Sequence, residues 1–425
     1  MTRVVAESPA LRDLDLFAGT GWGVACQRLG IDEMGVEIMP EAVATREANG
    51  MHTLYRDVWD GLQNPVVMAT FYKWIADGGS VDGFYELLIA SPPCQTFSLA
   101  GKGAGRAALD EVIEAIRLDA YKDPASLRAF GEKHDMRTAL VLTPLAHVWR
   151  DRPRLVALEQ VPSVLPVWEA CADVMRSLGY SVKVAVLNAE QYGVPQTRRR
   201  AILVARLDGE VQLPTPTHSR YYPRTPEKLD PGVKRWVSMA DALGWGMTDA
   251  PMHTIVAGTH GPTDRWASGG SSVRKQLDAK IGGPNWIDMP ASDAAKHSQQ
   301  KYDVRIGAEE AATIQTYPTA RFLRSNYGTG GDAAARGERG LDRPAPTLTS
   351  KADRNKWDGV RNMTSDEASA LQTYGRPFVW CGTKTMQFLQ IGNAVPPLLA
   401  EAILAAITAS EWDIEALAAE ELATA

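Results

Sequence analysis

The sequence predicts an α/β fold in which helices cover both faces of one sheet, followed by a smaller and more irregular region. Three observations support this prediction. A short apolar strand at 14–17 runs into a glycine turn and then a helix, which is the βα entry of a nucleotide-binding sheet. Apolar runs at 87–90 and 155–158 each end in polar residues. After about residue 207, apolar periodicity is short and broken, and Pro, Gly, Thr, Trp and His become frequent.

The first strand and its turn indicate a nucleoside site. Gly19 and Gly21 allow a tight turn and a close approach of the backbone to a ligand. Glu37 follows the next strand, at 34–36, where an acid accepts hydrogen bonds from ribose hydroxyls, and Asp57 ends the strand after that. The glycine spacing is not the full G-x-G-x-x-G pattern, so it favours an adenosyl ligand without a pyrophosphate. A purely structural turn is the alternative.

Cys94 is the strongest candidate for a catalytic residue. It follows the apolar strand Leu87–Ala90 through Ser91-Pro92-Pro93, and two prolines stop a strand while holding its last residues extended. Cys94 should therefore project from the carboxyl edge of the sheet, where open α/β sheets bind ligands. We predict that it is a nucleophile and that the glycine-rich segment after it is a closing loop. A turn cysteine without a function is the alternative.

Glu159 and a cluster of arginines complete the candidate site. Glu159 follows the apolar run Leu155–Leu158, which places it at the same sheet edge as Cys94. A carboxyl there can protonate or hydrogen-bond a heteroaromatic ring if its pKa is raised, although an ordinary surface acid fits equally well. The run Gln196–Arg200 precedes another strand. Its arginines either grip phosphates or orient a carboxylate, or they are solvated surface.

Length and charge restrict the class of protein. A chain of 425 residues, 45% of them hydrophobic, can bury a full core and is expected to form two domains. The net charge of −6 argues against a generally basic coat for nucleic acid. The tail after Thr408 carries five acidic residues and no Lys or Arg, however, and removing it brings the net charge from −6 to −1. A local positive groove is therefore compatible with the sequence.

The cysteines, at 26, 94, 171 and 381, are scattered without a CxxC pair or a His–Cys ligand spacing. We therefore expect neither a disulfide framework nor a metal site. The N-terminus has no apolar signal region, and no stretch is expected to be long enough to span a bilayer. These features predict a protein of the reducing cytoplasm with no membrane association.

Taken in order, these segments resemble the cytosine-C5 DNA methyltransferase family. The resemblance runs from residue 15 to about 200 and resumes from 343 to about 403. Single matches would be weak, but so many in the family's order are specific. The segments that carry it are Asp15–Gly21, Glu37, Asp57, Pro93-Cys94-Gln95, Asp135–Leu140, Gln196-x-Arg198-x-Arg200, Arg343–Thr349 and Gln390–Pro397.

The resemblance implies a Rossmann-like S-adenosylmethionine methyltransferase sheet, plus a smaller irregular target-recognition domain. It implies that the Cys94 thiolate adds to C6 of a flipped cytosine while Glu159 holds N3 and the exocyclic amine. Arg198, grouped with Arg200, would neutralise charge beside the ring. The implied cofactor residues are Asp15, Phe17, Gly19, Gly21, Glu37, Asp57, Pro93, Asn393 and Val395. The expected DNA-contacting residues are Gln95, Ser98, Arg265 and Arg274.

One position departs from the family. Members usually show Glu-Asn-Val, whereas this chain has Glu159-Gln160-Val161. Gln keeps the amide and adds a methylene, so the hydrogen bonds that position the cysteine loop are expected to shift. Because the carboxylate is present, we expect activity to be retained, at an unchanged or lower rate.

The expected domain order is split. Residues 1–206 form the catalytic S-adenosylmethionine-binding domain, 207–384 the target-recognition domain, and 385–425 a segment that returns to the catalytic domain. Within the recognition segment, 304–318 echoes 360–374. A duplicated anchor diverted to DNA and a chance similarity are equally open explanations.

The leading prediction is a monomeric DNA (cytosine-5-)-methyltransferase that acts on a specific double-stranded sequence in the cytoplasm of a bacterial cell, its own or a viral host. Restriction-modification with a cognate restriction enzyme, or evasion of restriction, is compatible with it. A tRNA cytosine-5 methyltransferase would keep the chemistry, but the long recognition segment favours DNA. A catalytically silent DNA-binding regulator would need neither Cys94 nor Glu159.

Overall fold

The computed structural model describes residues 11–77, 85–93, 104–243, 322–325, 337–358, 361–375 and 377–409. Several predicted residues lie outside these ranges: the nucleophile candidate Cys94 and the expected DNA contacts Gln95, Ser98, Arg265 and Arg274. The earlier copy of the repeat, 304–318, also lies outside them.

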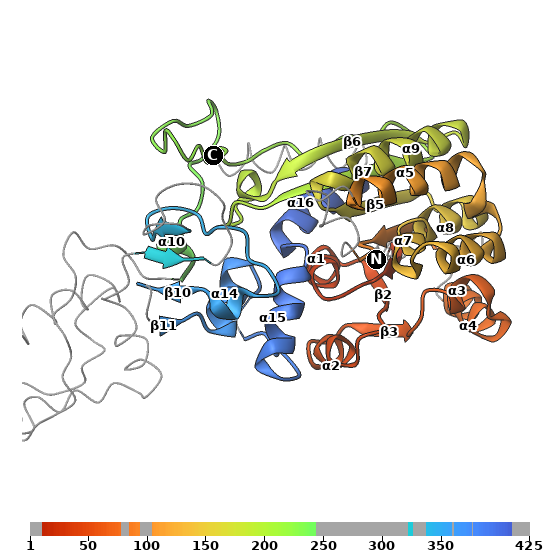
Figure 1. The fold of residues 1–425 in the computed structure, drawn as a ribbon, viewed down its shortest axis with the longest axis horizontal. Coiled ribbons are helices and arrows are strands. Elements are labelled where there is room, and N and C mark those ends of the chain that lie inside the picture. The colour runs from red at the N-terminus through yellow and green to blue at the C-terminus, as the bar shows by residue number, and fades with distance from the viewer. Residues whose placement is uncertain are drawn as a thin grey trace, which may run out of the picture.

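A seven-stranded sheet forms the larger part of the molecule (Figure 1). Its strand order is β3-β2-β1-β4-β5-β7-β6, and all strands are parallel except β7, which is antiparallel to both neighbours. The chain leaves β1 for one side of the sheet and returns to β4 on the other, so these two strands flank the topological switch point. The strands are β1 (Arg12–Leu16), β2 (Asp32–Val36), β3 (His52–Tyr55), β4 (Leu87–Ala90), β5 (Leu155–Gln160), β6 (Ser181–Asn188) and β7 (Arg199–Arg206).

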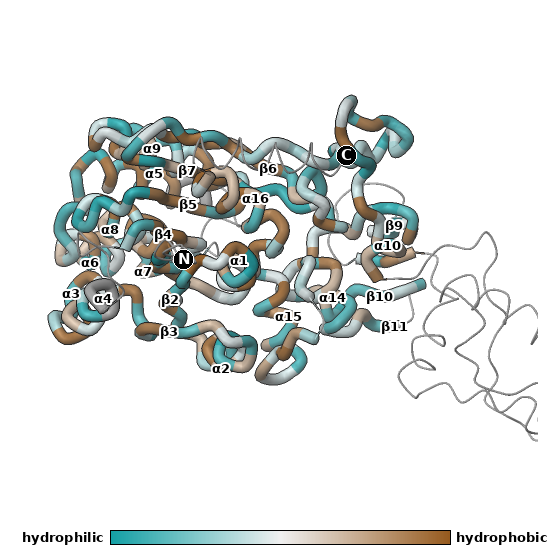
Figure 2. Tube along the Cα trace, turned by 180° about the vertical axis from the view of Figure 1, so that it is seen from behind, coloured by the Kyte–Doolittle hydropathy of each residue, from teal (hydrophilic) through white to brown (hydrophobic). Residues whose placement is uncertain are grey.

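Helices cover both faces of this sheet, which confirms the predicted α/β class. Side chains alternate along each strand, so Leu88 packs into one core cluster with α9 while Leu87 and Ile89 pack into another with α1 and α16. Figure 2 shows hydrophilic and hydrophobic residues alternating along peripheral helices such as α9. The helices of this part are α1 (Gly21–Leu29), α2 (Pro40–Ala48), α3 (Asp60–Gln63), α4 (Pro65–Asp77), α5 (Ala104–Arg117), α6 (Pro124–Lys133), α7 (Met136–Leu140), α8 (Thr143–Asp151), α9 (Leu165–Ser177) and α16 (Pro397–Thr408).

Two strands end earlier than expected. Phe17 has a φ of +60°, so it turns out of the sheet and β1 stops at Leu16. Asp57 does not end β3, because it lies two residues beyond Tyr55. Its Oδ1 accepts a hydrogen bond from the Trp59 amide at 3.0 Å, which opens the turn into α3.

The smaller part contains a four-stranded sheet of order β11-β10-β8-β9, on the side of the molecule away from α6 and α8 (Figure 1). Trp357, Leu371 and Phe388 lie in a third core cluster that joins it to its helices. In this cluster α15 packs against α14. The predicted boundary at 384/385 falls where α15 begins. The elements are β8 (Phe322–Arg324), β9 (Glu338–Gly340), β10 (Lys356–Trp357), β11 (Arg361–Asn362), α10 (Met239–Leu243), α14 (Ser365–Leu371) and α15 (Lys384–Asn393).

The stretch Lys384–Thr408 is long and apolar enough by composition to cross a membrane, which corrects the expectation that no stretch would be. It comprises α15 and α16, which are separated by Ala394–Pro396, and most of it is buried in the fold. Leu399 and Ile403 are fully buried in the core cluster that α16 shares with α1. Packing within the protein therefore accounts for its apolar character.

Candidate active site

A cavity of about 520 Å³ lies at the carboxyl ends of β1, β4 and β5. Segments far apart in the sequence build its wall: the glycine turn at 17–22, the residues after β2 and β3, the turn at 91–93, and 389–395 around the end of α15. Leu140, Glu159, Gln160, Val161 and Arg200 also line it. The cavity therefore occupies the switch point, where an α/β sheet is expected to bind its ligand.

The glycine turn is held in a strained shape by Glu37. Phe17 and Gly19 both have positive φ, and a bulky residue rarely adopts that conformation. One carboxylate oxygen of Glu37 accepts from the Gly19 amide at 2.9 Å, and the other accepts from the Met39 amide at 2.8 Å. Glu37 thus clamps the turn to the end of β2 beside the cavity.

The first and last motifs meet across a contact that only glycine permits. A Cβ atom on Gly21 would overlap the carbonyl oxygen of Val395, between α15 and α16. Asn393 and Val395 consequently lie on the cavity wall together with the glycine turn. The close approach explains why the glycine turn and the last motif belong to one site, although they are nearly the whole chain apart.

The cavity wall suits an adenosyl group. Phe17, Gly19, Gly21, Glu37, Asp57, Pro93, Asn393 and Val395 all line the cavity, as expected of cofactor residues. Sequence reasoning missed Trp22, Ile38, Met39 and Trp59, which line it too. Ile38 is 66% exposed. The sequence signal was an apolar residue directly after a strand-end acid. Ile38 offers a flat ring an apolar surface beside the Glu37 carboxylate.

Asp15 is the exception among the predicted cofactor residues, because it lies behind the cavity wall rather than on it. Asp13, Asp15 and Glu33 are buried around the guanidinium of Arg46. Burial and the neighbouring carboxylates raise the pKa of Asp13 and of Asp15 well above the usual range. Charged residues inside otherwise apolar strands were the overlooked sequence signal for this cluster.

Arg46 ties this buried cluster to the glycine turn. Its Nη2 donates to Glu33 Oε1 at 2.7 Å, and its Nη1 donates to the Gly19 carbonyl at 3.1 Å. The guanidinium passes where a side chain on Gly35 would stand, so a strand glycine makes room for it. Gly19 is therefore held through its amide by Glu37 and through its carbonyl by Arg46.

Glu159 and Arg200 form an ion pair on the cavity wall. Glu159 is the fifth residue of β5, and Arg200 lies on the neighbouring antiparallel strand β7. Arg200 Nε lies 2.6 Å from Glu159 Oε1, and both side chains are largely buried. The arginine thereby fixes the orientation of the carboxylate, one of the roles that the sequence left open for this cluster.

Gln160 holds the turn that precedes Cys94. Its amide nitrogen donates to the Pro92 carbonyl, and its Oε1 accepts from the Val161 amide at 2.5 Å. The longer side chain therefore contacts the cysteine turn directly. Its effect on the reaction rate stays a prediction.

Arg198 does not act where the sequence placed it. It is fully buried, is absent from the cavity wall, and donates to the carbonyls of Leu348, Gly392 and Ala394 at 2.9–3.0 Å. The prediction that it neutralises charge beside a bound ring is therefore wrong. Gln196 is similar, since its Oε1 accepts from the Leu348 amide at 2.9 Å. These two side chains join the recognition segment and the end of α15 to the catalytic sheet.

Comparisons with known proteins identify the family of the chain. A family model described as C-5 cytosine-specific DNA methylase matches residues 128–409. The chain is 27% identical to the type II methyltransferase M1.HphI of Haemophilus parahaemolyticus over 406 residues, which cover 94% of this chain and 87% of that protein. It is 27% identical to the type II methyltransferase M.XorII of Xanthomonas oryzae pv. oryzae over 420 residues, 92% of this chain and 82% of the other.

A similar solved structure is that of the S. pombe Dnmt2 methyltransferase. It has a TM-score of 0.47 and 13% sequence identity, and the match covers 96% of this chain and 99% of that one.

Proposed function

The chain belongs to the C-5 cytosine-specific DNA methylase family, and we propose that it methylates its DNA through a covalent bond between Cys94 and C6 of a cytosine flipped out of the duplex. It is a DNA cytosine-5 methyltransferase, and its methyl donor is S-adenosylmethionine. The covalent step, the flipped base and the roles of single residues constitute the proposal.

One observation carries the proposal. A single cavity is lined by the glycine turn, by the Ser91–Pro93 turn directly before Cys94, and by the Glu159–Arg200 pair. Cofactor residues and candidate reacting residues therefore share one space of about 520 Å³, as a direct transfer between two bound groups requires.

The chemistry explains why these residue types belong together. S-adenosylmethionine supplies an electrophilic methyl group, but C5 of cytosine is a poor nucleophile. The Cys94 thiolate forms a bond to C6, which breaks the aromaticity of the ring and makes C5 nucleophilic. Glu159 binds N3 and the exocyclic amine and stabilises this adduct, while Arg200 holds the carboxylate in place. After C5 gains the methyl group, a base removes the C5 proton and the thiolate leaves.

A cytosine inside a stacked duplex cannot enter this cavity. The target nucleotide is therefore flipped out, at a cost of a few kcal/mol that phosphate contacts and the segment after Cys94 offset. The recognition segment between the arginine motif and Arg343 selects the sequence. We further propose a monomer of the cytoplasm that modifies one short motif in restriction-modification, since two relatives are named type II methyltransferases.

Bisulfite sequencing tests the activity and the target together. The protein and its Cys94→Ser variant are expressed in a host that lacks C5 methylation, and genomic DNA is sequenced. We expect protected cytosines in one short motif with the wild-type protein and none with the variant. Protection by both proteins would refute the role of Cys94, and protection by neither would withdraw the assignment of genomic DNA as the substrate.

A trapping experiment tests the covalent step. A duplex with 5-fluorocytosine at the target position cannot lose the C5 substituent as a proton, so the adduct should persist on a denaturing gel in the presence of cofactor. The Cys94→Ser variant serves as the control. Turnover of the normal duplex without any adduct on the fluorinated one would show that the reaction takes another route.

A further inference from the structure

The mechanism proposed above gives Trp22 no role. It is the second residue of α1, it is 1% exposed, and it is one of the residues that line the cofactor cavity. It also lies in the core cluster with Ile89 of β4 and Val395. An indole N–H is a donor only, and a buried one needs an acceptor.

The acceptor of Trp22 belongs to the cysteine turn. Its Nε1 donates to Ser91 Oγ at 2.9 Å, across 69 residues of sequence. Ser91 follows β4 directly, and its own amide donates to the Leu16 carbonyl at 3.2 Å. The start of the turn is therefore tied to the end of β1 through its backbone and to the start of α1 through its side chain.

The rest of the turn, Pro92 and Pro93, is also restricted. The next residue, Pro92, accepts through its carbonyl from Gln160, so β5 holds the turn from another side. Two consecutive prolines have fixed φ angles and no N–H, which leaves little freedom between Ser91 and Cys94. A shift of Ser91 is consequently expected to move Pro92 and Pro93 with it.

We propose that Trp22 is a positioning residue that couples the cofactor cavity to the nucleophile through its hydrogen bond to Ser91. Trp22 is one of the residues that line the cavity, and its N–H holds Ser91, the first residue of the turn that precedes Cys94. A bound adenosyl compound contacts Trp22 and so restricts the Ser91–Pro93 turn, which directly precedes Cys94 in the sequence. The inference rests on the proposed role of Cys94, but it concerns how Cys94 is oriented and not whether methyl transfer follows.

The test measures the thiol directly and needs no methyl transfer. Alkylation of Cys94 by iodoacetamide is followed by mass spectrometry of its peptide, with and without saturating S-adenosylhomocysteine. The wild-type protein should show a ratio of the two rates that differs from one by roughly 2- to 10-fold, the range that one neutral hydrogen bond supports. Trp22→Phe removes the donor and Ser91→Ala removes the acceptor, so each should bring the ratio close to one.

A double variant and a matched control separate coupling from stability. Trp22→Phe with Ser91→Ala should give the same ratio as either single change, because both remove the same hydrogen bond. Trp168→Phe also removes a buried indole hydrogen bond, to the Ala201 carbonyl, but outside the cavity. It should lower the melting temperature while leaving the ratio at the wild-type value.

Two results would overturn the proposal. The first is a wild-type ratio of one, since the cofactor cavity would then not affect the thiol. The second is a wild-type ratio that Ser91→Ala retains, which would indicate simple steric shielding by the bound compound. Neither result depends on whether Cys94 is the nucleophile, which the bisulfite and trapping experiments test separately.

Discussion

Among the residues that the structure describes, Glu159 forms its ion pair with the guanidinium of Arg200 on the adjacent strand. The two atoms nearest each other, Arg200 Nε and Glu159 Oε1, are 2.6 Å apart on the wall of the cavity. Charge-assisted hydrogen bonds of this kind contribute about 1.5–3 kcal/mol. The two arginines of the motif thus differ in position, because Arg200 lines the cavity and Arg198 joins segments of the fold.

The variant Arg200→Gln tests that division. Without the guanidinium the carboxylate loses its fixed direction, so the single-turnover rate should fall roughly 10- to 100-fold. Arg199→Gln is the matched control, because Arg199 is the neighbouring residue and is exposed. Equal rates for the two variants would mean that Glu159 does not depend on Arg200.

The variant Gln160→Asn tests the departure from the family at this position. Asn is shorter by one methylene, so on the same backbone its amide cannot reach the Pro92 carbonyl. This contact reverses the direction expected from the sequence: we expect turnover of the Asn variant to fall roughly 2- to 10-fold, the effect of removing one hydrogen bond. Unchanged turnover would show that the extra methylene is inconsequential.

At the scale of elements, the start of α1 and the connection between α15 and α16 form one side of the cofactor cavity. Their close approach depends on Gly21, where any side chain would meet the Val395 backbone. The same connection supplies the carbonyls of Gly392 and Ala394 to Arg198. The returning C-terminal segment is therefore part of the cofactor site.

Gly21→Ala should weaken cofactor binding and stability together. The added methyl group cannot be accommodated by a side-chain movement, and overpacking of this kind costs about 1–3 kcal/mol. Calorimetric titration with S-adenosylhomocysteine and thermal melting measure the two effects. Gly375→Ala is the control, because a Cβ there meets no atom within 4 Å and its φ is not positive.

Glu190 predicts a pH dependence of stability at the junction between β6 and the recognition segment. Burial raises the pKa of Glu190 to about 7, against the lowering effects of Arg220 and Arg339. The folded-state pKa lies above the unfolded value, so ionisation opposes folding, and stability is lost as the pH rises from about 4.5 to about 7. Glu190→Gln should therefore melt higher than wild type at pH 8 and at a similar temperature at pH 4.

A pH series of melting temperatures measures this difference. It should grow between about pH 4.5 and pH 7 and stay constant above that window. A difference of the same size at every pH would show that packing, rather than the charge, is responsible.

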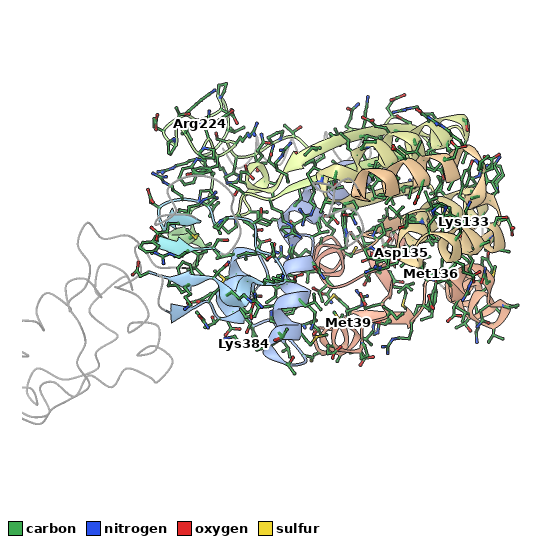
Figure 3. The ribbon with its side chains drawn as sticks, viewed as in Figure 1. Met39, Lys133, Asp135, Met136, Arg224 and Lys384 are labelled. Carbon is green, nitrogen blue, oxygen red and sulfur yellow. The ribbon has the colours of Figure 1, made fainter. Side chains whose placement is uncertain are left out.

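At the scale of the whole molecule, a net charge of −6 conceals a local concentration of cations. Arg220, Arg224, Lys228, Lys234 and Arg235 are all exposed on the segment 217–236, and none forms an ion pair with a residue that the structure describes. Asp230 shapes this segment by accepting from the Tyr222 hydroxyl at 2.6 Å. Arg224 lies at its outer end (Figure 3).

We expect this segment to bind DNA phosphates. Changing Arg220, Arg224 and Lys228 together to Gln should weaken duplex binding and reduce the slope of log K against log salt by about 0.9 for each phosphate that the protein no longer neutralises. Fluorescence anisotropy over a range of salt concentrations measures the slope. The control variant changes Lys73, Lys133 and Lys183, which are exposed on the catalytic part, with Lys133 at the opposite end (Figure 3). Equal slopes for the two triple variants would refute the expectation.

The parts of the site that the sequence predicted are those encoded by local pattern. Apolar runs predicted β4 and β5, and the polar residues after or at their ends lie on the cavity wall. Glu37 and the glycine turn were equally accessible, because strand, turn and helix are set by neighbouring residues. Asp15 was misplaced because alternation along β1 turns its side chain behind the wall, and no local pattern shows which face the ligand takes.

The sequence by itself determined the class of fold, the order of the chemical groups along the chain, and the family that this order implies. Only the tertiary structure decided which side chains are partners: Thr20 with Tyr374 at a separation of 354 residues, Arg198 with the carbonyl of Ala394, and Trp22 with Ser91. Periodicity reports whether a residue is buried, whereas the identity of its partner depends on how distant segments pack. The assignments of Arg198 and Trp22 therefore required the fold, while those of Cys94 and Glu159 could be made without it.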